Sequence, residues 1–297
     1  MKQFYILDER EIWHEAACAA ARSHGYEAKR IFSGWPPPKD GGVGFIRPHA
    51  DWRKLPLNQT DYVRMRNSGL TMIQDQAQMD VYEDKSEQFA RWSHWMPDTW
   101  RFDDADMAMG FLDAAPYPLV SKADVGASSV NVRILKNKAE AQEHMKRLFG
   151  FGIPVHHGAN CPKTLQRGYA LLQRFIQHTT TYRVNAMGNA RAVFFRHCYP
   201  DKPVAQTGNV DPAFEMTPEL ESLLEYCDVV FDDIGSKWCA LDVLKDGDEW
   251  KLLETSLCWP WPSPGDCNQG TIFRSGGKKW IEMFDVMFDE VERGAWT

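Results

Sequence analysis

Residues 238–264 read WCALDVLKDGDEWKLLETSLCWPWPSP, two apolar runs joined by a short polar segment, with one carboxylate in the interior of each run. The joining residues 245–248 have the composition of a hairpin turn, and the runs have the length of strands. If the loop holds an odd number of residues centred on Asp248, Asp242 lies opposite Glu254 on one face. Opposed Cβ atoms are about 4.5–5.5 Å apart. The stretch therefore predicts an antiparallel hairpin with a close pair of acids.

This pair of acids needs a compensating charge or a proton. Two carboxylates at this separation repel each other, and an ionised carboxylate among apolar side chains is costly, so the pair requires a proton, a basic partner or a metal cation. Mg²⁺ suits such oxygen ligands, because it typically uses one or two carboxylates and completes its shell with substrate phosphates. The alternative is an exposed hairpin edge whose acids face water.

The chain as a whole has the composition of an ordinary globular protein. Its 297 residues, 43% of them hydrophobic, can form one large domain or two to three smaller ones. The formal net charge of −7 gives no global basic surface for nucleic acid, although a local basic groove remains open. No run approaches the roughly 18 apolar residues of a membrane span, and the amino terminus lacks the apolar run of a signal peptide, so we expect a cytoplasmic protein without membrane contact. The seven cysteines show no Cys-x-x-Cys spacing, which argues against a disulfide framework and a zinc site.

The amino-terminal part alternates between strand and helix patterns. Strand patterns cover 3–8, 28–32, 44–48 and 70–75, a helical pattern runs to Ser23, and residues 60–67 form a helix or an exposed turn. The initial strand, helix and strand predict a parallel α/β layer. Three arginines here, Arg47, Arg64 and Arg66, form either an anion-binding cluster or a set of solvated side chains.

The middle of the chain predicts a small α+β unit. A helical pattern covers 80–95, a strand at 118–123 contains Lys122, a second strand covers 130–135, and a helix covers 140–148. Gly126, Ser128 and Ser129 lie at the tip between the two strands, where backbone N–H groups and hydroxyls can cover phosphate oxygens. Residues 150–163 are expected to be irregular. His156 and His157 within them have no third ligand at a suitable spacing for a metal site.

The carboxyl-terminal part predicts more paired strands. Strands are expected at 169–176, 182–186, 190–196 and in the hairpin quoted first, a loop at Gly208-Asn209, and helices at 218–226 and 279–291. Arg183 and Arg196 lie inside strands, where each guanidinium needs a carboxylate or a phosphate. Trp259 and Trp261 either wall a substrate pocket or pack in a loop. The turn at 275–279, with Arg274, either holds a substrate anion or is solvated.

The order of these features resembles the ATP-grasp superfamily of the carboxylate-amine ligase type over residues 84–264. The resemblance rests on Lys85 before a helix, the Pro97-Asp98-Thr99 step, and the PYPLVSK, LLQRFI, YRV, FR, ALDVL and LLETS segments in colinear order. It implies an α/β fold in which two α+β subdomains clasp ATP, preceded by a Rossmann-like domain. The implied domains are 1–80, 81–168 with the phosphate loop, and 169–297 with the Mg²⁺ site.

The resemblance also implies roles for individual residues. Lys85 and Lys122 look like the phosphate-binding lysines, and Gly126, Ser128 and Ser129 like the mobile phosphate loop. Gln173, Arg174, Phe175 and Ile176 look like the hinge strand that borders adenine. Lys122, Arg183 and Arg196 look like catalytic cations, and Asp242, Glu254 and Ser256 like Mg²⁺ ligands. Two positions depart from the family: Ser256 replaces the usual Asn, and Arg174 replaces a common acid.

The implied reaction is ATP-dependent ligation. ATP would phosphorylate a substrate carboxylate, and an amine would then attack the acyl phosphate to form an amide. The expected partners are small-molecule or peptide carboxylates and amines, and no residue pattern indicates an oligomeric state. Two alternatives remain: a phosphotransferase on the same fold, and a nucleotide-binding module without turnover, which Ser256 makes conceivable.

Overall fold

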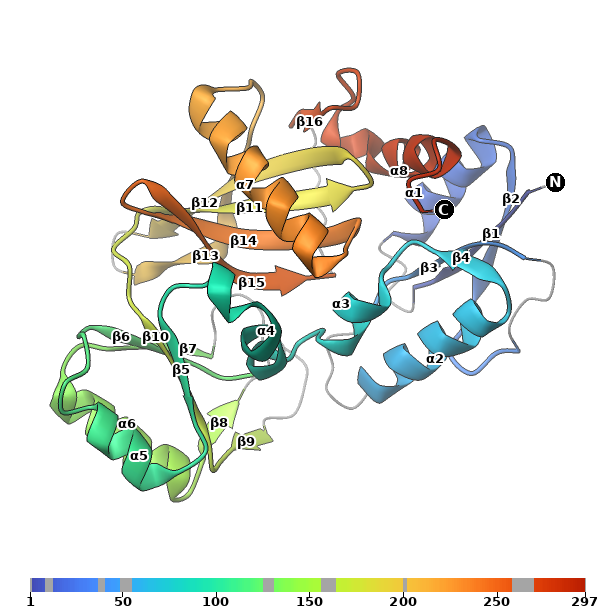
Figure 1. Ribbon diagram of the computed structural model, residues 1–297. Helices are drawn as coiled ribbons and strands as arrows, with labels where there is room; N and C mark the ends of the chain where they lie inside the picture. Colours follow the sequence, from blue (N-terminus) through green and yellow to red (C-terminus); the bar gives the residue numbers. More distant parts are fainter. Residues whose placement is uncertain are drawn as a thin grey trace.

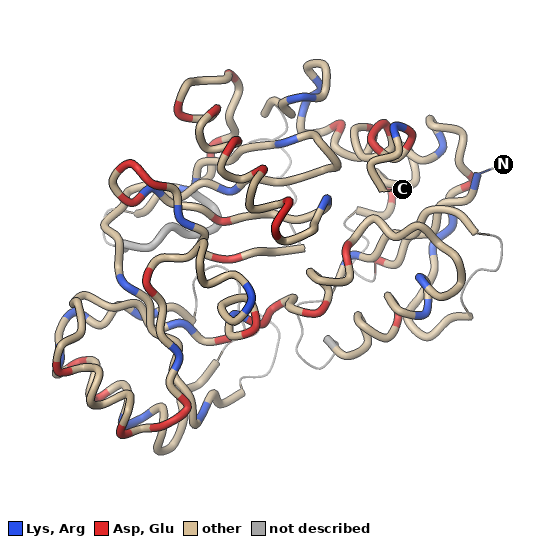
Figure 2. Tube along the Cα trace, viewed as in Figure 1, with Lys and Arg blue, Asp and Glu red and all other residues tan. Residues whose placement is uncertain are grey.

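The computed structural model describes residues 2–8, 13–36, 41–48, 55–124, 131–155, 164–199, 202–257 and 270–296, without the side chains of residues 55 and 202–209. These residues form a parallel sheet, a small antiparallel sheet and a large antiparallel sheet, together with a two-stranded ribbon (Figure 1). No helix among them is long and apolar enough to cross a membrane. Acidic and basic residues are interspersed along the described trace (Figure 2).

The amino-terminal sheet has the strand order β2-β1-β3-β4, with all neighbours parallel. Its elements are β1 (Lys2–Leu7), α1 (His14–Ser23), β2 (Tyr26–Ile31), β3 (Gly42–Ile46), α2 (Leu55–Asn67) and β4 (Leu70–Met72). The predicted parallel α/β layer is therefore confirmed, and residues 60–67 belong to a helix. Apolar side chains of α2 and of α3 (Gln76–Asp80) pack on one face of this sheet, together with Leu257 from the far end of the chain.

The small sheet has the order β5-β10-β6-β7, and its neighbours are antiparallel. Its strands and covering helices are β5 (Thr99–Phe102), α5 (Ala105–Phe111), β6 (Leu119–Lys122), β7 (Val132–Leu135), α6 (Lys138–Phe149) and β10 (Ala170–Arg174). Before them in the chain come α4 (Lys85–Trp92) and η1 (Ser93–Trp95), whose apolar side chains join the core of the large sheet. Helices α5 and α6 cover one face around a separate apolar core. Strand β10 pairs inside this sheet, so the expected domain boundary between residues 168 and 169 would separate β10 from the other strands of the sheet.

Two expectations in this unit are corrected. The helix expected over 80–95 is interrupted before Lys85, because Glu83 has a left-handed φ of 59° and the Asp84 side chain caps a new helix by accepting the Glu87 N–H at 2.9 Å. The segment expected to be irregular begins with a strand, β8 (Ile153–Val155), which pairs with β9 (Thr164–Gln166).

The large sheet has the order β13-β12-β11-β14-β15. Its elements are β11 (Thr180–Met187), β12 (Ala190–Tyr199), β13 (Lys202–Pro212), α7 (Pro218–Ile234), β14 (Trp238–Asp246), β15 (Glu249–Ser256) and β16 (Ile272–Phe273), followed by η2 (Trp280–Glu282) and α8 (Met283–Glu292). The loop expected at Gly208-Asn209 is wrong. Gly208 and Asn209 lie inside strand β13. Arg196 of β12 pairs with Val210 and Cys198 pairs with Ala205, so Gly208 and Asn209 lie in an irregularity of a paired strand.

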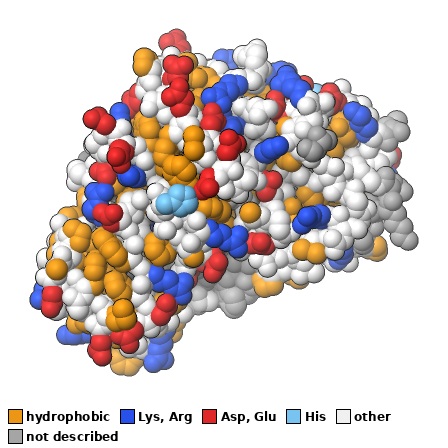
Figure 3. Space-filling model, in the orientation of Figure 1, with side chains coloured by type: hydrophobic (Ala, Val, Ile, Leu, Met, Phe, Trp, Pro, Cys, Tyr) orange, Lys and Arg blue, Asp and Glu red, His pale blue; other side chains and the backbone are white. Residues whose placement is uncertain are grey.

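The two faces of the large sheet are buried differently. Alternate residues such as Val184 and Leu241 face α7, whose helix extends eight residues beyond the expected end at Tyr226 and stops at a left-handed Gly235. The opposite residues, including Met187 and Trp238, pack against α1 and α8 (Figure 1). This second apolar cluster joins the large sheet to the amino-terminal unit. Hydrophobic side chains also reach the surface over the small sheet and α7 (Figure 3), for example Met107 and Val229.

Candidate functional site

The hairpin between β14 and β15 places Asp242 directly opposite Glu254, as predicted, but not by the expected loop. Asp246 pairs with Glu249, so the loop has only two residues, Gly247 and Asp248. Regular pairing from such a loop would place Asp242 opposite Leu253. A register shift between Asp242 and Val243 leaves Leu253 as the extra residue of a β-bulge and brings Glu254 into line.

Charged side chains form a row across one face of the large sheet. Arg183 on β11 lies opposite Asp242 on β14, and Arg196 on β12 lies diagonally beside Arg183. Arg183 Nε and Nη2 donate to the two Asp242 carboxylate oxygens at 2.6 and 2.7 Å, and Arg196 Nη1 donates to Oδ2 at 2.7 Å. Burial alone would raise the pKa of Asp242, but the two guanidinium groups outweigh it and hold the pKa well below its ordinary value.

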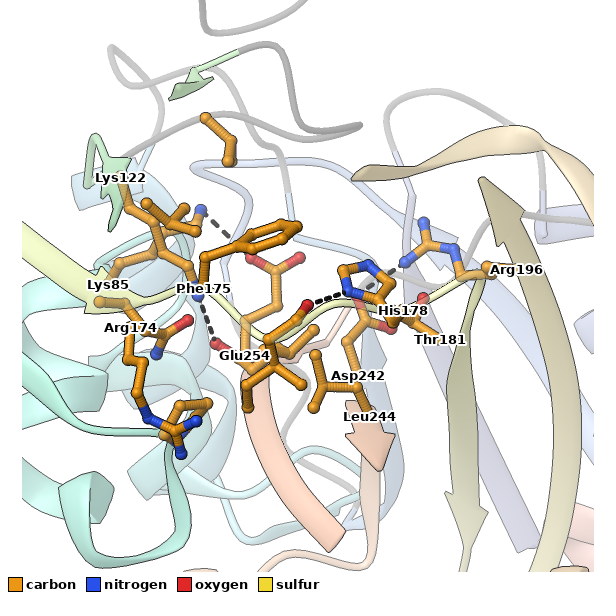
Figure 4. Close-up of a pocket in the computed structure, with 16 residues that line it drawn as sticks. Lys85, Lys122, Arg174, Phe175, His178, Thr181, Arg196, Asp242, Leu244 and Glu254 are labelled. Carbon is orange, nitrogen blue, oxygen red and sulfur yellow. Dashed lines mark hydrogen bonds and ion pairs between the residues drawn. The ribbon is translucent and has the colours of Figure 1, made fainter. Parts of the chain in front are cut away.

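Two lysines approach the same row from outside the large sheet (Figure 4). Lys85 Nζ at the start of α4 lies 3.4 Å from Glu254 Oε2, and Lys122 Nζ on β6 donates to the Leu253 carbonyl oxygen at 3.2 Å. Burial lowers the pKa of Lys122 to about 8, with a further contribution from Lys85. Burial would also lower the pKa of Lys85, but Glu254 and Glu83 outweigh it and raise the pKa.

A pocket that opens to solvent, with a cavity volume of about 100 Å³, lies between the small and large sheets. Apolar and charged side chains both line it (Figure 4). The apolar side chains are Val120, Val132, Phe175, Ile176, Leu244 and Leu253. The charged side chains are Lys85, Lys122, Arg174, Arg196, Asp242 and Glu254. Such a lining suits a ligand that combines a flat heterocycle with a polyanion.

Most of the expected site residues meet in this pocket. Lys85, Lys122, Gln173, Arg174, Phe175, Ile176, Arg196, Asp242 and Glu254 all line it. Arg183 lies behind Asp242 and is not among the described lining residues. Ser256 follows two residues after Glu254 and so shares its face of β15. Gly126, Ser128 and Ser129 lie outside the described residues, as do His156, His157, Trp259 and Trp261.

The side chains at the start of the hinge segment are engaged by protein groups. Gln173 Nε2 donates to Thr99 Oγ1 at 2.8 Å. Arg174 donates to Asp98 at 3.0 Å and to Asp246 at 2.6 Å. Arg174 therefore connects the small sheet to the hairpin of the large sheet.

The structure adds residues that the sequence did not single out. His178 and Thr181 line the pocket. His178 Nδ1 lies 2.7 Å from the Ile176 carbonyl oxygen, which requires a proton on Nδ1 and leaves Nε2 as an acceptor in the neutral ring. This Nε2 is buried without a hydrogen-bond partner among the described residues. The polar QHTTT sequence after the hinge strand was the available signal.

Asp124, the last described residue before the segment expected to form the phosphate loop, bonds several residues around it. Its Oδ1 accepts from the Ser86 N–H at 3.0 Å and from the Ser86 hydroxyl at 2.5 Å, and its Oδ2 accepts from the Tyr169 hydroxyl. The Lys85 N–H also donates to its carbonyl oxygen at 3.3 Å. Burial, followed by the bond to Asp124, raises the pKa of Tyr169. The start of α4 is thereby tied to the end of β6.

Magnesium fits this donor set only together with a polyanion. No group of three or more His, Cys, Asp or Glu side chains that could hold a metal occurs in the described ranges. Two opposed carboxylates are nevertheless a typical protein share of an Mg²⁺ site that is completed by phosphates. Asp242 and Glu254 are already neutralised by Arg183, Arg196 and Lys85, so a nucleotide would have to draw these cations to its phosphates.

Two other candidate anion sites are not supported by the contacts. Arg47 lies 3.9 Å from Asp8, whereas Arg64 pairs with Asp61 and Arg66 with Gln76, so these arginines have separate partners. In the glycine- and lysine-rich turn, Arg274 pairs with Asp228 at 2.5 Å and Lys278 with Glu282 at 3.5 Å. These contacts give neither segment the shape of an anion-binding cluster, and Arg47, with its side chain 10% exposed, packs over the Trp13 ring instead of facing water.

Several solved structures have a similar fold, although no family model and no curated protein matches the chain. D-cycloserine synthetase DcsG is 13% identical with a TM-score of 0.63, and the match covers 99% of this chain and 100% of that chain. A RimK domain ATP-grasp protein from Sphaerobacter thermophilus DSM 20745 is 15% identical with a TM-score of 0.60, covering 98% and 99%. The ATP-grasp ligase PsnB, complexed with minimal precursor, Mg and ADP, is 12% identical with a TM-score of 0.59, covering 88% and 90%. These similarities confirm at the level of the fold the resemblance seen in the sequence: the chain has the ATP-grasp fold.

Proposed function

We propose that this protein is an Mg²⁺-dependent ATP-grasp ligase that joins a carboxylate to an amine through an acyl phosphate. The observation that carries the proposal is the opposed pair of Asp242 and Glu254, with Lys85, Lys122 and Arg196 around it, in a pocket that apolar side chains also line. Cationic side chains exceed carboxylates here, so the site favours an anion with several negative charges. ATP supplies both that anion and a flat base that can contact the apolar side chains of the lining.

Each group has a role in this proposal. The hinge residues Gln173 to Ile176 border adenine, and His178 Nε2 accepts a hydrogen bond from the nucleotide. Lys85, Lys122 and Arg196 neutralise the phosphates, while Arg183 holds Asp242 in place. Asp242, Glu254 and Ser256 would hold Mg²⁺, which would offset charge on the transferred phosphoryl group. Gly126, Ser128 and Ser129 would cover that group as the phosphate loop.

The reaction needs alignment and charge neutralisation more than a protein nucleophile. A substrate carboxylate oxygen attacks the γ-phosphorus, and the bond to the ADP oxygen breaks. The amine nitrogen then attacks the acyl carbon, loses a proton and displaces phosphate. Fixed cations favour both steps because they stabilise charge on the phosphoryl oxygens, and exclusion of water protects the acyl phosphate.

The finer assignments follow from the same proposal. We infer three units close to 1–80, 81–168 and 169–297, with β10 assigned to the small unit and the first unit, Rossmann-like, on the acceptor side. The substrates would be small-molecule or peptide carboxylates and amines, and the reaction would take place in the cytoplasm. A phosphotransferase or a module without turnover would use the same nucleotide pocket.

The test is Mg²⁺-dependent ATP binding by the wild type, Glu254→Gln and Glu249→Gln, measured by calorimetry with Mg²⁺ and with EDTA. Glu249 is a matched control because it is an exposed acid on the same strand. We expect Glu254→Gln to lose most of the Mg²⁺-dependent affinity, about tenfold or more, and Glu249→Gln to behave as the wild type. Equal binding by all three proteins, or no MgATP binding by the wild type, would overturn the proposal.

Turnover then separates the ligase from its alternatives. ADP and phosphate release should appear only with particular carboxylate and amine pairs, and the product should contain a new amide. A phosphorylated hydroxyl product would support the phosphotransferase, and binding without any turnover across such pairs would support the inactive module.

A further inference from the structure

The strand that carries Glu254 lies at the edge of the large sheet. β15 has β14 on one side and no further strand on the other in the described sheet, so its outward N–H and C=O groups require partners of another kind. The bulge at Leu253 interrupts its regular pairing just before Glu254. An edge strand with a bulge fixes a side chain less firmly than a central strand does.

The buried side chain of Gln88 supplies those partners. Its Oε1 accepts from the Thr255 N–H at 2.9 Å, and its Nε2 donates to the Thr255 carbonyl oxygen at 3.2 Å. One carboxamide thus satisfies both outward backbone groups of the residue next to Glu254. Gln88 is 3% exposed and Thr255 5%, so water has little access to these bonds.

Two side chains on one face of helix α4 contact two consecutive residues of this strand. Lys85 and Gln88 are three residues apart, which places them side by side on a helix. Lys85 lies against the Glu254 carboxylate at 3.4 Å, and Gln88 holds the backbone of Thr255. The helix itself is fastened by Ser86 to Asp124. The relative position of Lys85 and Glu254 therefore depends on how Gln88 aligns the strand.

We propose that Gln88 is a positioning residue for the metal site: its carboxamide aligns edge strand β15 so that Glu254 faces Asp242 and Lys85, although Gln88 touches neither metal nor nucleotide. The inference rests on the proposed function, in which Glu254 is an Mg²⁺ ligand. Removing the carboxamide leaves two buried backbone groups of Thr255 without partners, and the strand relieves this cost by shifting or by admitting water.

The test compares Gln88→Met, Gln88→Glu and Gln78→Met with the wild type. Methionine nearly preserves the length of glutamine but cannot form the paired bonds, and glutamate keeps only the acceptor for the Thr255 N–H. Gln78 is a matched control, because it is 1% exposed on α3 and makes none of these contacts. Gln88→Glu also serves if the methionine variant does not fold.

Two readouts are measured: amide hydrogen exchange across residues 252–256 in the protein alone, and binding of a non-hydrolysable ATP analogue at varied Mg²⁺ and in EDTA. We expect Gln88→Met to exchange faster in this segment and to need about tenfold more Mg²⁺ for half-maximal binding, with unchanged binding in EDTA. The exchange rate and the Mg²⁺ requirement of Gln88→Glu should lie between those of the wild type and Gln88→Met. Those of Gln78→Met should match the wild type.

Three results would overturn the inference. They are an unchanged Mg²⁺ requirement in Gln88→Met, an equal loss of binding with and without Mg²⁺, and an equal effect of Gln78→Met. The same measurements on Glu254→Gln distinguish a failure of the inference about Gln88 from a failure of the proposed function. If Glu254→Gln loses Mg²⁺-dependent binding while Gln88→Met does not, only the role of Gln88 falls; if the wild type shows no such binding, both fall.

Discussion

At the scale of single residues, the site is governed by the ion group formed by Asp242, Arg183 and Arg196. All three side chains are nearly buried, with 6%, 8% and 11% exposed. Such a group offsets its desolvation only when geometry is good, which the two-point contact of Arg183 provides. Arg196 lines the pocket, whereas Arg183 is not among its described lining residues. Arg183 thus holds Asp242, while Arg196 is placed to move to an arriving anion.

Arg183→Met is expected to destabilise the fold by about 3–5 kcal/mol, because it leaves a buried carboxylate with a single partner. Urea unfolding of the protein without nucleotide measures this free energy. Arg183→Lys restores a charge without the two-point geometry and should lose less. A loss below about 1 kcal/mol, typical of an exposed pair, would show that Asp242 does not depend on Arg183.

The sequence could predict that these residues meet, although the pairing of Asp242 with Glu254 depends on a bulge and not on strand periodicity alone. Asp242 and Glu254 lie in apolar runs joined by a turn. An unpaired guanidinium inside a strand is costly, which implies a carboxylate or phosphate partner for Arg183. The bulge at Leu253 could not be predicted, because the expected loop with an odd number of residues and the observed loop of two residues both leave apolar residues in each run. The bond from Gln88 to Thr255 was also out of reach, because no local pattern relates residues so far apart in the chain.

At the scale of elements, β6 is positioned by the helix beneath it. Ser121 on β6 lies next to Lys122, and its hydroxyl oxygen is 2.9 Å from His144 Nε2 on α6. Burial lowers the pKa of His144 to about 4, and Arg133 and Arg147 lower it further. The neutral ring therefore packs behind the strand that carries Lys122, on the face away from the pocket.

Stability is expected to fall as the pH drops from about 6.5 to about 4. In this window the unfolded chain binds a proton on His144 and the folded chain does not. His144 therefore contributes at most about 1.4 kcal/mol per pH unit to the slope of the free energy of unfolding against pH. Urea unfolding at several pH values measures it. His144→Gln should remove this part of the slope, and His14→Gln, at a half-buried histidine on α1, should retain it. An unchanged slope in His144→Gln would contradict the assignment.

Element boundaries show where local sequence signals end. The caps of α7, Thr217 and Gly235, are visible in the sequence, yet the helix was predicted too short because acidic residues interrupt its apolar pattern after Tyr226. The left-handed Glu83 that starts a new helix has no such signal, since glutamate usually continues a helix. The new helix is nevertheless fixed locally, since the Asp84 side chain accepts the Glu87 N–H.

At the scale of the whole molecule, the chain divides into a larger body and a smaller one. The amino-terminal unit and the large sheet share one apolar cluster, whereas the small sheet has its own. The candidate pocket lies between the two bodies, so its width depends on the contacts across them. Arg174 makes such a contact, from β10 of the small sheet to Asp246 of the large-sheet hairpin, at 2.6 Å.

Asp246→Asn is expected to weaken binding of MgATP by a few fold, about two to five, because loss of a partly exposed pair makes open arrangements more populated. Small-angle X-ray scattering without nucleotide should show a larger mean radius, and calorimetry should show the weaker binding. Asp98→Asn is the matched control, since Asp98 also bonds Arg174 but precedes β5 within the small unit. In a double-mutant cycle, Arg174→Gln should add little to Asp246→Asn. Equal effects of Asp98→Asn and Asp246→Asn would show that Arg174 stabilises the hinge locally and does not hold the two bodies together.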